Sequence, residues 1–434
     1  MRRAVRLSPF VRFSLSHIIV VGGGPAGSST AWHLARAGLS VTLVDRARFP
    51  RAKPCAEYVS PEGARILHAM GALQTLEDGT SAKLTGMVVH APSGDTIRGE
   101  FVAQHGFHGF RDSGLGVRRE ILDTVLLNCA RKAGVTVIEE AKVDDVLRDG
   151  RGVTTGVRLR TRDGISDLHG SFVVGADGLR SVVARRLRLA RTSRWPRRVA
   201  LVAHFRGVTG VRTLGEMHVF RDGYVGIASV GDGVTNVALV VPKGRAQTMA
   251  GNTEAYLHAW LAAHPALQRR FTSAERVSPV RATGPFASHA KRAWAPGAAL
   301  VGDAADFFDP FTGEGIYSAL RGGELASPFI VEAACAIDCG RFDVSARALA
   351  AYERARRETF AGKWRVERLI GAAVAVPAVM NVAARVLGRD AEIADLLVGV
   401  TGDFVPASAL LSPRILARLF FPRANMPLPL PDQA

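Results

Sequence analysis

The chain has 434 residues, more than one hydrophobic core usually supports, so we expect two closely packed domains. Hydrophobic residues make up 47% of the sequence and charged residues 22%, a composition that excludes a disordered chain. The net charge of +17 comes from 56 basic and 39 acidic residues, and the basic residues are almost all Arg.

A positive run extends from Arg180 to Arg198 and contains eight Arg but no Asp or Glu. Because solvated helix faces normally mix both signs, such a run is typical of contact with an anionic partner. A cofactor phosphate, an acyl-carrier surface and an anionic membrane remain open, as does a plain solvated helix. Nucleic acid is not expected, because no recognition motif accompanies the run.

The cysteines and the apolar segments indicate the compartment. Four scattered cysteines fit a reducing environment: Cys55, Cys129, Cys335 and Cys339. Residues 1–16 are a basic extension without the apolar stretch of a signal peptide. Leu369–Ala384 is free of charge for 16 residues, short of the roughly 20 that cross a bilayer, so we expect a buried or interfacial helix there. These features predict a cytoplasmic protein, with a peripheral membrane location as an alternative.

The first elements along the chain form a β-α-β unit. His17–Val21 is a short apolar run that predicts a strand, and a glycine-rich loop and a helix through Ala37 follow it. Gly38 stands where a helix C-cap belongs, and Val41–Val44 predicts the second strand. The unit has roughly the 30 residues that such a motif needs.

The later elements predict an interrupted α/β domain. Residues 46–64 are expected to form a loop, and from Gly313 onward the chain is expected to be mostly helical. Further expected elements are sheet strands within 84–110, a helix over Arg119–Ala133, and strands over Val135–Glu139, Thr154–Arg160, Asp167–Val174 and Ala298–Val301. Between Val199 and Val241 the alternation has period two, which favours an antiparallel sheet as a separate layer.

The expected domains follow from this order. A discontinuous nucleotide-binding domain takes residues 17–83, 111–195 and 285–335. A sheet-rich substrate domain takes 84–110 and 196–284, and a helical region takes 336–434. The predicted fold class is therefore α/β, with an inserted antiparallel sheet domain and a helical C-terminal region.

The glycine-rich loop carries the first chemical signal. Gly22 permits a tight turn, Gly24 lets a pyrophosphate approach the backbone, and Gly27 lets helix and strand pack closely. The helix N-terminus adds partial positive charge for the phosphates. Asp45 ends the second strand, where a carboxylate accepts hydrogen bonds from ribose hydroxyls, and the adjacent Arg46 belongs to the same predicted cofactor site.

Two further segments identify the dinucleotide. Val174–Gly178 reads VGADG, and residues 299–315 contain ALVGDAA followed by DPFTGEG. With the glycine-rich loop they resemble the three fingerprints of the flavoprotein superfamily that includes para-hydroxybenzoate-type monooxygenases and geranylgeranyl reductases. The resemblance implies an FAD-binding Rossmann-like domain of the para-hydroxybenzoate hydroxylase type.

The resemblance also implies residue roles. Asp303, with Gly302 before it, would hydrogen-bond the ribityl chain, and Asp177 would lie near the pyrophosphate. Arg119 would lie on the helix that packs over FAD. The residues whose backbone would approach the isoalloxazine edge are Pro310, Gly313 and Gly315.

Two segments indicate which branch of the superfamily the chain resembles. Lys53-Pro54-Cys55 resembles the Lys-x-Cys of geranylgeranyl reductases, so Cys55 is a candidate for proton transfer or an inert thiol. Tyr224 is a second catalytic candidate: it matches the Tyr of the reductases' Tyr-x-Trp-x-Phe-Pro stretch, although the Trp and Phe are absent here. The Trp-x-Trp-x-Ile-Pro segment of flavin halogenases is also absent, so halogenation is not expected.

Three functions follow. The first is an FAD-dependent reductase acting on an isoprenoid or lipid double bond, with NAD(P)H as a transient donor. The second is an FAD-dependent monooxygenase acting on an aromatic or polyketide substrate, and the third is a non-catalytic lipid carrier. The carrier is disfavoured because Asp45, Asp177 and Asp303 are all present. No metal site is expected, since His105 and His108 lack a third ligand.

Overall fold

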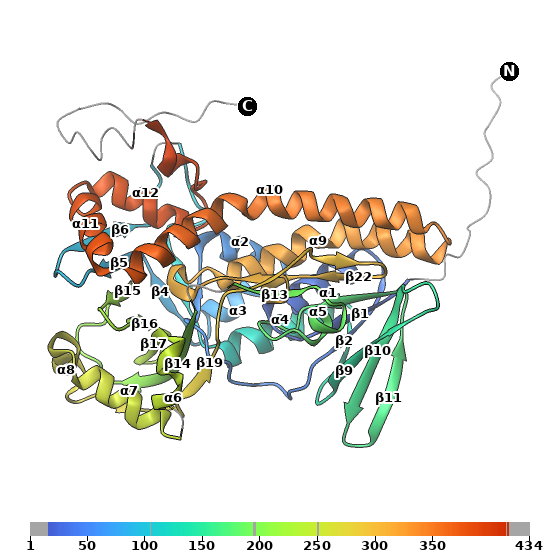
Figure 1. The fold of residues 1–434 in the computed structure, drawn as a ribbon, viewed down its shortest axis with the longest axis horizontal. Helices are drawn as coiled ribbons and strands as arrows, with labels where there is room; N and C mark the ends of the chain where they lie inside the picture. The colour runs from blue at the N-terminus through green and yellow to red at the C-terminus, as the bar shows by residue number, and fades with distance from the viewer. Residues whose placement is uncertain (1–15, 105, 194–196, 250, 414, 416–434) are drawn as a thin grey trace.

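The fold is described from a computed structural model, for residues 16–104, 106–193, 197–249, 251–413 and 415. The predicted N-terminal extension, apart from Ser16, and His105 lie outside these residues. A six-stranded sheet forms one end of the molecule, in the order β21-β22-β12-β1-β2-β8, and all its pairs are parallel except β21 with β22 (Figure 1). Its strands are β1 (His17–Val21), β2 (Ser40–Val44), β8 (Thr136–Ile138), β12 (Phe172–Gly175), β21 (Trp294–Ala295) and β22 (Ala298–Leu300).

Helices cover one face of this sheet, and the long α10 lies over α9 (Figure 1). The central β1 is an unbroken apolar run because both of its faces are buried, as is typical of a parallel strand. A three-stranded sheet, β11-β10-β9, projects from the other side of the molecule (Figure 1). The bounds are α1 (Pro25–Arg36), α4 (Arg119–Lys132), α9 (Gly315–Asp338), α10 (Phe342–Ala375), β9 (Lys142–Arg148), β10 (Thr154–Thr161) and β11 (Gly164–His169).

An eight-stranded sheet builds the second layer, with β19 paired to β14 beside the path β18-β14-β17-β16-β15-β5-β6. The predicted antiparallel sheet is confirmed within Val199–Val241, where all pairs are antiparallel, and β5 adds a parallel pair with β15. Strand β5 arrives from a separate part of the chain, so no hairpin fixes its direction. The strands are β5 (Gly86–His90), β6 (Thr96–Glu100), β14 (Arg198–Arg206), β15 (Leu214–Val219), β16 (Tyr224–Ser229), β17 (Val234–Pro242), β18 (Glu275–Arg276) and β19 (Arg281–Thr283).

Both faces of this sheet are covered. Leu201 and Phe205 of β14 pack with Trp260 on one face, under three helices that the sequence did not predict. Val202, also in β14, points to the opposite face with Tyr224, toward the C-terminal helices. The helices concerned are α6 (Ala246–Met249), α7 (Thr253–Ala262), α8 (Pro265–Phe271), α11 (Pro377–Leu387) and α12 (Ala391–Thr401).

Short elements connect these layers, and two sequence predictions are wrong here. The expected loop 46–64 contains β3 and the start of α2, and the expected strand Asp167–Val174 is divided between β11 and β12 at Gly170. The remaining elements are β3 (Tyr58–Val59), α2 (Pro61–Ala69), α3 (Leu73–Glu77), β4 (Ala82–Leu84), β7 (Gly114–Gly116), α5 (Val182–Arg186), β13 (Ala190–Thr192), β20 (Ser288–Ala290) and β23 (Asp306–Phe307), with short 3₁₀ helices η1 (Lys243–Arg245), η2 (Gly302–Ala304), η3 (Pro310–Thr312) and η4 (Ala409–Leu411).

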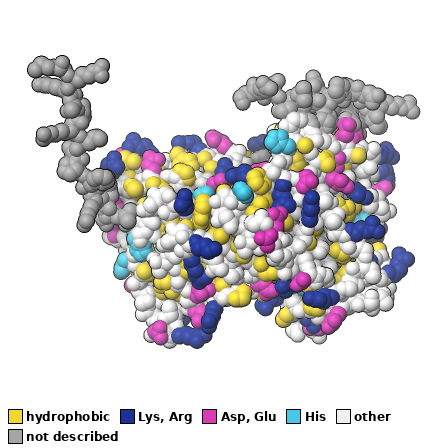
Figure 2. Space-filling model, turned by 180° about the vertical axis from the view of Figure 1, so that it is seen from behind, with side chains coloured by type: hydrophobic (Ala, Val, Ile, Leu, Met, Phe, Trp, Pro, Cys, Tyr) yellow, Lys and Arg dark blue, Asp and Glu magenta, His cyan; other side chains and the backbone are white. Residues whose placement is uncertain are grey.

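Acidic and basic side chains mix on one face of the molecule. On the face shown in Figure 2, Lys and Arg are interspersed with Asp and Glu, so the net charge of +17 is not gathered there into one patch.

The close packing of α1 on α9 makes a test of the fold. A Cβ at Gly323 of α9 would lie 2.7 Å from the Thr30 nitrogen of α1, so we expect Gly323→Ala to lower the free energy of unfolding by about 1–3 kcal/mol. Gly362→Ala in α10 is the control, because its Cβ would meet only Ala407 at 3.4 Å, and there a gain of up to about 1 kcal/mol is expected. Urea unfolding measures both, and equal stability of the two variants would contradict the packing argument.

Candidate functional site: an FAD cleft joined to an apolar pocket

The glycine-rich loop between β1 and α1 is too tightly packed for side chains at two of its positions. Gly22 has a φ of +106°, and a Cβ there would lie 2.5 Å from the Ala176 carbonyl oxygen. A Cβ at Gly27 would lie 1.7 Å from the Gly22 carbonyl oxygen. In front of the loop the space is open, because a Cβ at Gly24 would meet only guanidinium nitrogens, those of Arg119 and Arg51, both at 3.6 Å. The loop is thus a cradle at a helix N-terminus, flanked by positive charge, which suits a pyrophosphate.

Asp45 fastens this loop. Its two carboxylate oxygens accept hydrogen bonds from the Gly23 N–H at 2.7 Å and from the Ala47 N–H at 2.8 Å. Each oxygen retains a lone pair, so the predicted ribose contact stays a prediction. Arg46 beside it is exposed.

Asp177, two residues after β12, has one carboxylate oxygen that none of the described residues satisfies. Its Oδ2 accepts a hydrogen bond from the Val182 N–H at 2.5 Å. Its Oδ1 is buried and has no hydrogen-bond partner among the described residues. Burial raises the pKa of this carboxyl. A buried oxygen without a partner is costly in a folded protein, so a bound polar group would satisfy it.

Arg119 begins α4 and reaches into the cleft. Its guanidinium donates two hydrogen bonds of 2.8 Å to Asp123, and Arg51 also pairs with Asp123 at 3.0 Å. Lys53 and Asp303 complete the charged end of the cleft. Burial lowers the pKa of Lys53, with a further decrease from the nearby Arg119 charge. Burial also raises the pKa of Asp303, against the opposing effect of Lys53 and Arg119.

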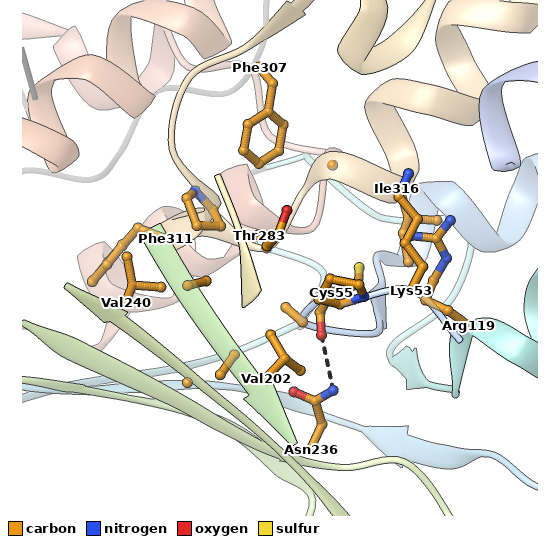
Figure 3. A pocket seen from close by; sticks show the side chains of 18 of the residues that line it. Lys53, Cys55, Arg119, Val202, Asn236, Val240, Thr283, Phe307, Phe311 and Ile316 are labelled. Atoms are coloured by element: carbon orange, nitrogen blue, oxygen red, sulfur yellow. Dashed lines mark hydrogen bonds between the residues drawn. The ribbon is translucent and has the colours of Figure 1, made fainter. Parts of the chain in front are cut away.

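A pocket extends from this charged end to the second sheet (Figure 3). Its far wall is apolar and includes Val202 of β14, Val240 of β17, and Phe311. The structure brings eight of the predicted site residues into the lining: Gly24, Cys55, Arg119, Tyr224, Asp303, Pro310, Gly313 and Gly315. The other predicted residues are not part of the lining: Gly22, Gly27, Asp45, Arg46, Asp177 and Gly302.

Cys55 lies at the wall of this pocket, between the charged and apolar ends (Figure 3). Burial lowers the pKa of the Arg119 guanidinium, but Asp123 and then the nearby Cys55 raise it above its usual value, so the thiol lies close to this cation. The Cys55 carbonyl oxygen accepts a hydrogen bond from Asn236 Nδ2 of β17 at 3.0 Å. The thiol is therefore held at a fixed place beside a cation.

Glu57 supports this arrangement, and the sequence analysis missed it. The residue is buried in the left-handed region at a φ of +59°, unusual for a side chain other than Gly. Its carboxylate accepts hydrogen bonds from the Arg119 backbone N–H at 2.8 Å and from Asn236 Nδ2 at 2.9 Å. It also pairs with His204 Nε2 of β14 at 2.7 Å. No local pattern in the sequence points to these distant partners.

Tyr224 is buried in the wall rather than free to act on a ligand. Its hydroxyl donates to Asp309 Oδ1 at 2.7 Å, and the other Asp309 oxygen is ion-paired with Arg198. Burial raises the pKa of Tyr224, and Asp309 raises it further. Its catalytic role stays a prediction, but the hydroxyl proton is already engaged by Asp309.

A buried ionic cluster lies behind the third fingerprint. Lys363 Nζ of α10 is 2.6 Å from Glu314 and 2.7 Å from Asp403. Burial raises the pKa of Glu314 and of Glu367 to about 7, and that of Asp403 to about 8. Only Glu314, between Gly313 and Gly315, lies within a recognised motif.

A second polar cluster lies on the outer side of the substrate sheet. His90, Glu216 and His218 place possible ligand atoms within 4.8 Å of one another. Arg270 already pairs with Glu216, donating one hydrogen bond at 2.8 Å. The carboxylate thus has a cation from the chain itself, and we treat this group as an ion-pair network.

The residues present fit FAD. The cradle of the glycine-rich loop suits the pyrophosphate, and the guanidinium groups of Arg51 and Arg119 lie beside it. Asp303 would hold the ribityl chain, and the backbone at Gly313 and Gly315 would approach the ring system.

Comparison with known proteins agrees with this fit. The FAD binding domain family matches residues 16–323. A digeranylgeranylglycerophospholipid reductase of Methanothrix thermoacetophila is 30% identical over 79% of this chain and 83% of its own. Conditioned medium factor receptor 1 of Dictyostelium discoideum is 27% identical over 74% of this chain, which spans only 64% of that protein.

The solved structures show the same fold. The myxobacterial chondrochloren halogenase CndH superposes with a TM-score of 0.72 over 95% of this chain and 91% of its own, at 23% identity. At this identity the likeness concerns the fold alone.

The fit to FAD predicts the effect of removing Asp303. We expect Asp303→Ala to weaken FAD binding roughly tenfold or more, because a hydrogen bond to a charged group contributes about 1.5–3 kcal/mol. Flavin absorbance per protein after dialysis measures it, with the exposed Asp163→Ala as control. Unchanged flavin content in the Asp303 variant would contradict the assignment.

The ionic cluster predicts a pH dependence of stability. Since the pKa of Glu367 is raised from 4.5 to about 7, the folded state holds more protons than the unfolded state between these values. The free energy of unfolding should therefore fall as pH rises from about 4.5 to about 7, by up to about 1.4 kcal/mol per pH unit for each extra proton. Glu367→Gln should flatten this slope in urea unfolding, and the exposed Glu358→Gln on the same helix should not.

Proposed function

Because this chain belongs to the FAD binding domain family, we propose that it is an FAD-dependent reductase that adds hydrogen across a carbon–carbon double bond of an isoprenoid lipid. The observation that carries the proposal is a thiol, that of Cys55, at the wall of a pocket whose far end is apolar. The reductase of Methanothrix thermoacetophila, 30% identical, supports the same substrate class.

Reduction of a double bond requires a hydride on one carbon and a proton on the other. FAD, held by the glycine-rich loop, Arg119 and Asp303, would supply the hydride equivalent when bound. Cys55 supplies the proton, and the Arg119 guanidinium beside it stabilises the sulfur once the proton has left. The apolar wall binds the hydrocarbon and excludes water, while Glu57 and Asn236 position the loop that carries the thiol.

The electron donor is part of the proposal. The sequence contains one glycine-rich dinucleotide loop, which FAD takes. We therefore expect NAD(P)H to bind transiently and to leave before the lipid reacts.

The proposal predicts the effect of replacing the thiol. We expect Cys55→Ala to lower kcat for olefin reduction at least about a hundredfold, the contribution typical of a positioned acid. FAD content should be unchanged, because Cys55 does not belong to the cradle. The exposed Cys339→Ala is the matched control and should retain full activity.

The measurement is anaerobic reoxidation of the reduced protein by a geranylgeranyl lipid, followed by absorbance near the flavin band and by mass analysis of the product. A saturated product supports the proposal. Oxygen uptake stimulated by substrate, with a hydroxylated product, would instead assign a monooxygenase.

A further inference from the structure

The junction of α10 and α11 forms an apolar elbow, residues 369–382. The chain passes from Ala375 through Val376 into Pro377, and the two helix axes differ by 116°. Val376 is extended, with φ −122° and ψ 96°, because a residue before Pro avoids the helical region. The break thus follows from the sequence, and it turns the apolar segment into a corner.

The outer side of the elbow is exposed and hydrophobic. Four large apolar side chains stand in solvent here: Leu369 at 60% exposure, Val376 at 43%, Val379 at 50% and Val382 at 58%. They account for half of the eight exposed large hydrophobic residues among those described. Exposed apolar side chains gathered this densely are typical of a surface that meets a partner or a membrane.

The inner side of the elbow packs against the wall of the pocket. Val374 and Met380 belong to the same buried cluster as Tyr224 and Phe311, which line the pocket. At Gly371 a Cβ would lie 3.5 Å from the Phe308 ring. The inner side of the elbow therefore packs behind residues that line the pocket.

The exposed charges that flank the elbow along the chain are positive, and one of them, Arg385, pairs with Asp95 of the turn between β5 and β6 at 3.6 Å. Residues 364–389 contain four exposed Arg and a single acidic residue, Glu367, which belongs to the buried cluster around Lys363. The four are Arg365, Arg368, Arg385 and Arg389. An apolar surface bordered by arginines complements a bilayer with anionic headgroups.

The elbow would lie on a membrane rather than cross it. Among the described residues no single helix is long and apolar enough to span a bilayer, and only the bent pair α10 and α11 passes that test together. With the pair bent by 116°, both helices cannot run along one bilayer normal.

We propose that the apolar elbow docks this protein on an anionic lipid bilayer and so brings the pocket to its lipid substrate, an inference that rests on the proposed function. The run from Arg180 to Arg198 is a weaker candidate, because it does not form one surface. Arg198 is buried in an ion pair with Asp309, whereas Arg185 and Arg188 are exposed.

The test is cosedimentation of the FAD-loaded protein with vesicles of phosphatidylcholine, with and without phosphatidylglycerol. The double variant Val379→Asp/Val382→Asp should lose roughly tenfold or more in vesicle partition, because two charges would enter the interface. Ile165→Asp on β11, a residue also 58% exposed, is the matched control and should bind as the unaltered protein does. Arg365→Gln/Arg389→Gln should weaken binding to phosphatidylglycerol vesicles and leave binding to phosphatidylcholine nearly unchanged.

Separate measurements of folding, olefin reduction, vesicle binding and particle size keep the outcomes distinct. Flavin content and thermal unfolding establish that each variant is folded. If the elbow variant keeps its activity on a detergent-dispersed olefin but loses vesicle binding, both proposals are supported. Vesicle binding without olefin reduction overturns the function alone. Equal binding by all variants, absence of binding by the unaltered protein, or a dimer in light scattering that the elbow variant abolishes, would overturn lipid docking.

Discussion

The buried carboxylate of Glu57 joins the separate parts of the chain that surround the pocket. One oxygen accepts from the backbone at the start of α4, and the other meets Asn236 and His204 on neighbouring strands of the second sheet. Because Glu57 adjoins the Lys53–Cys55 segment, this one group fixes the thiol relative to both layers. A left-handed backbone at a residue other than Gly costs about 1–3 kcal/mol, so the three hydrogen bonds must offset that strain.

A second carboxylate, that of Asp309, connects the wall of the pocket to the exposed elbow. Asp309 holds the Tyr224 hydroxyl and the Arg198 guanidinium, and Arg198 donates a further hydrogen bond of 2.8 Å to the Gly371 carbonyl of α10. Gly371 lies within the elbow. Asp309 and Arg198 therefore link the wall of the pocket to the elbow through hydrogen bonds and an ion pair.

The sequence predicts what depends on neighbours along the chain. The turn at Gly22 and the packing of Gly27 follow from spacing, because only a hydrogen fits at those positions. The sequence does not predict groups that meet across the fold. Asn236 reaches a carboxylate 179 residues away, and Lys363 reaches Asp403 across 40. The sequence analysis missed helices α6 to α8. Their apolar residues form a recognisable packing face only once the fold places them over β14.

Burial shifts the pKa of a cation and the pKa of an anion at the charged end of the pocket. The pKa of Lys53 is lowered and that of Asp303 is raised, and the first cause of each is loss of water. This buried, charged end suits the polar part of FAD, to which Arg119 and Asp303 would bind. The apolar lining at the other end, with Val202 and Phe311, suits a hydrocarbon chain and leaves little room for water beside it. The two ends of one pocket thus divide cofactor binding from substrate binding.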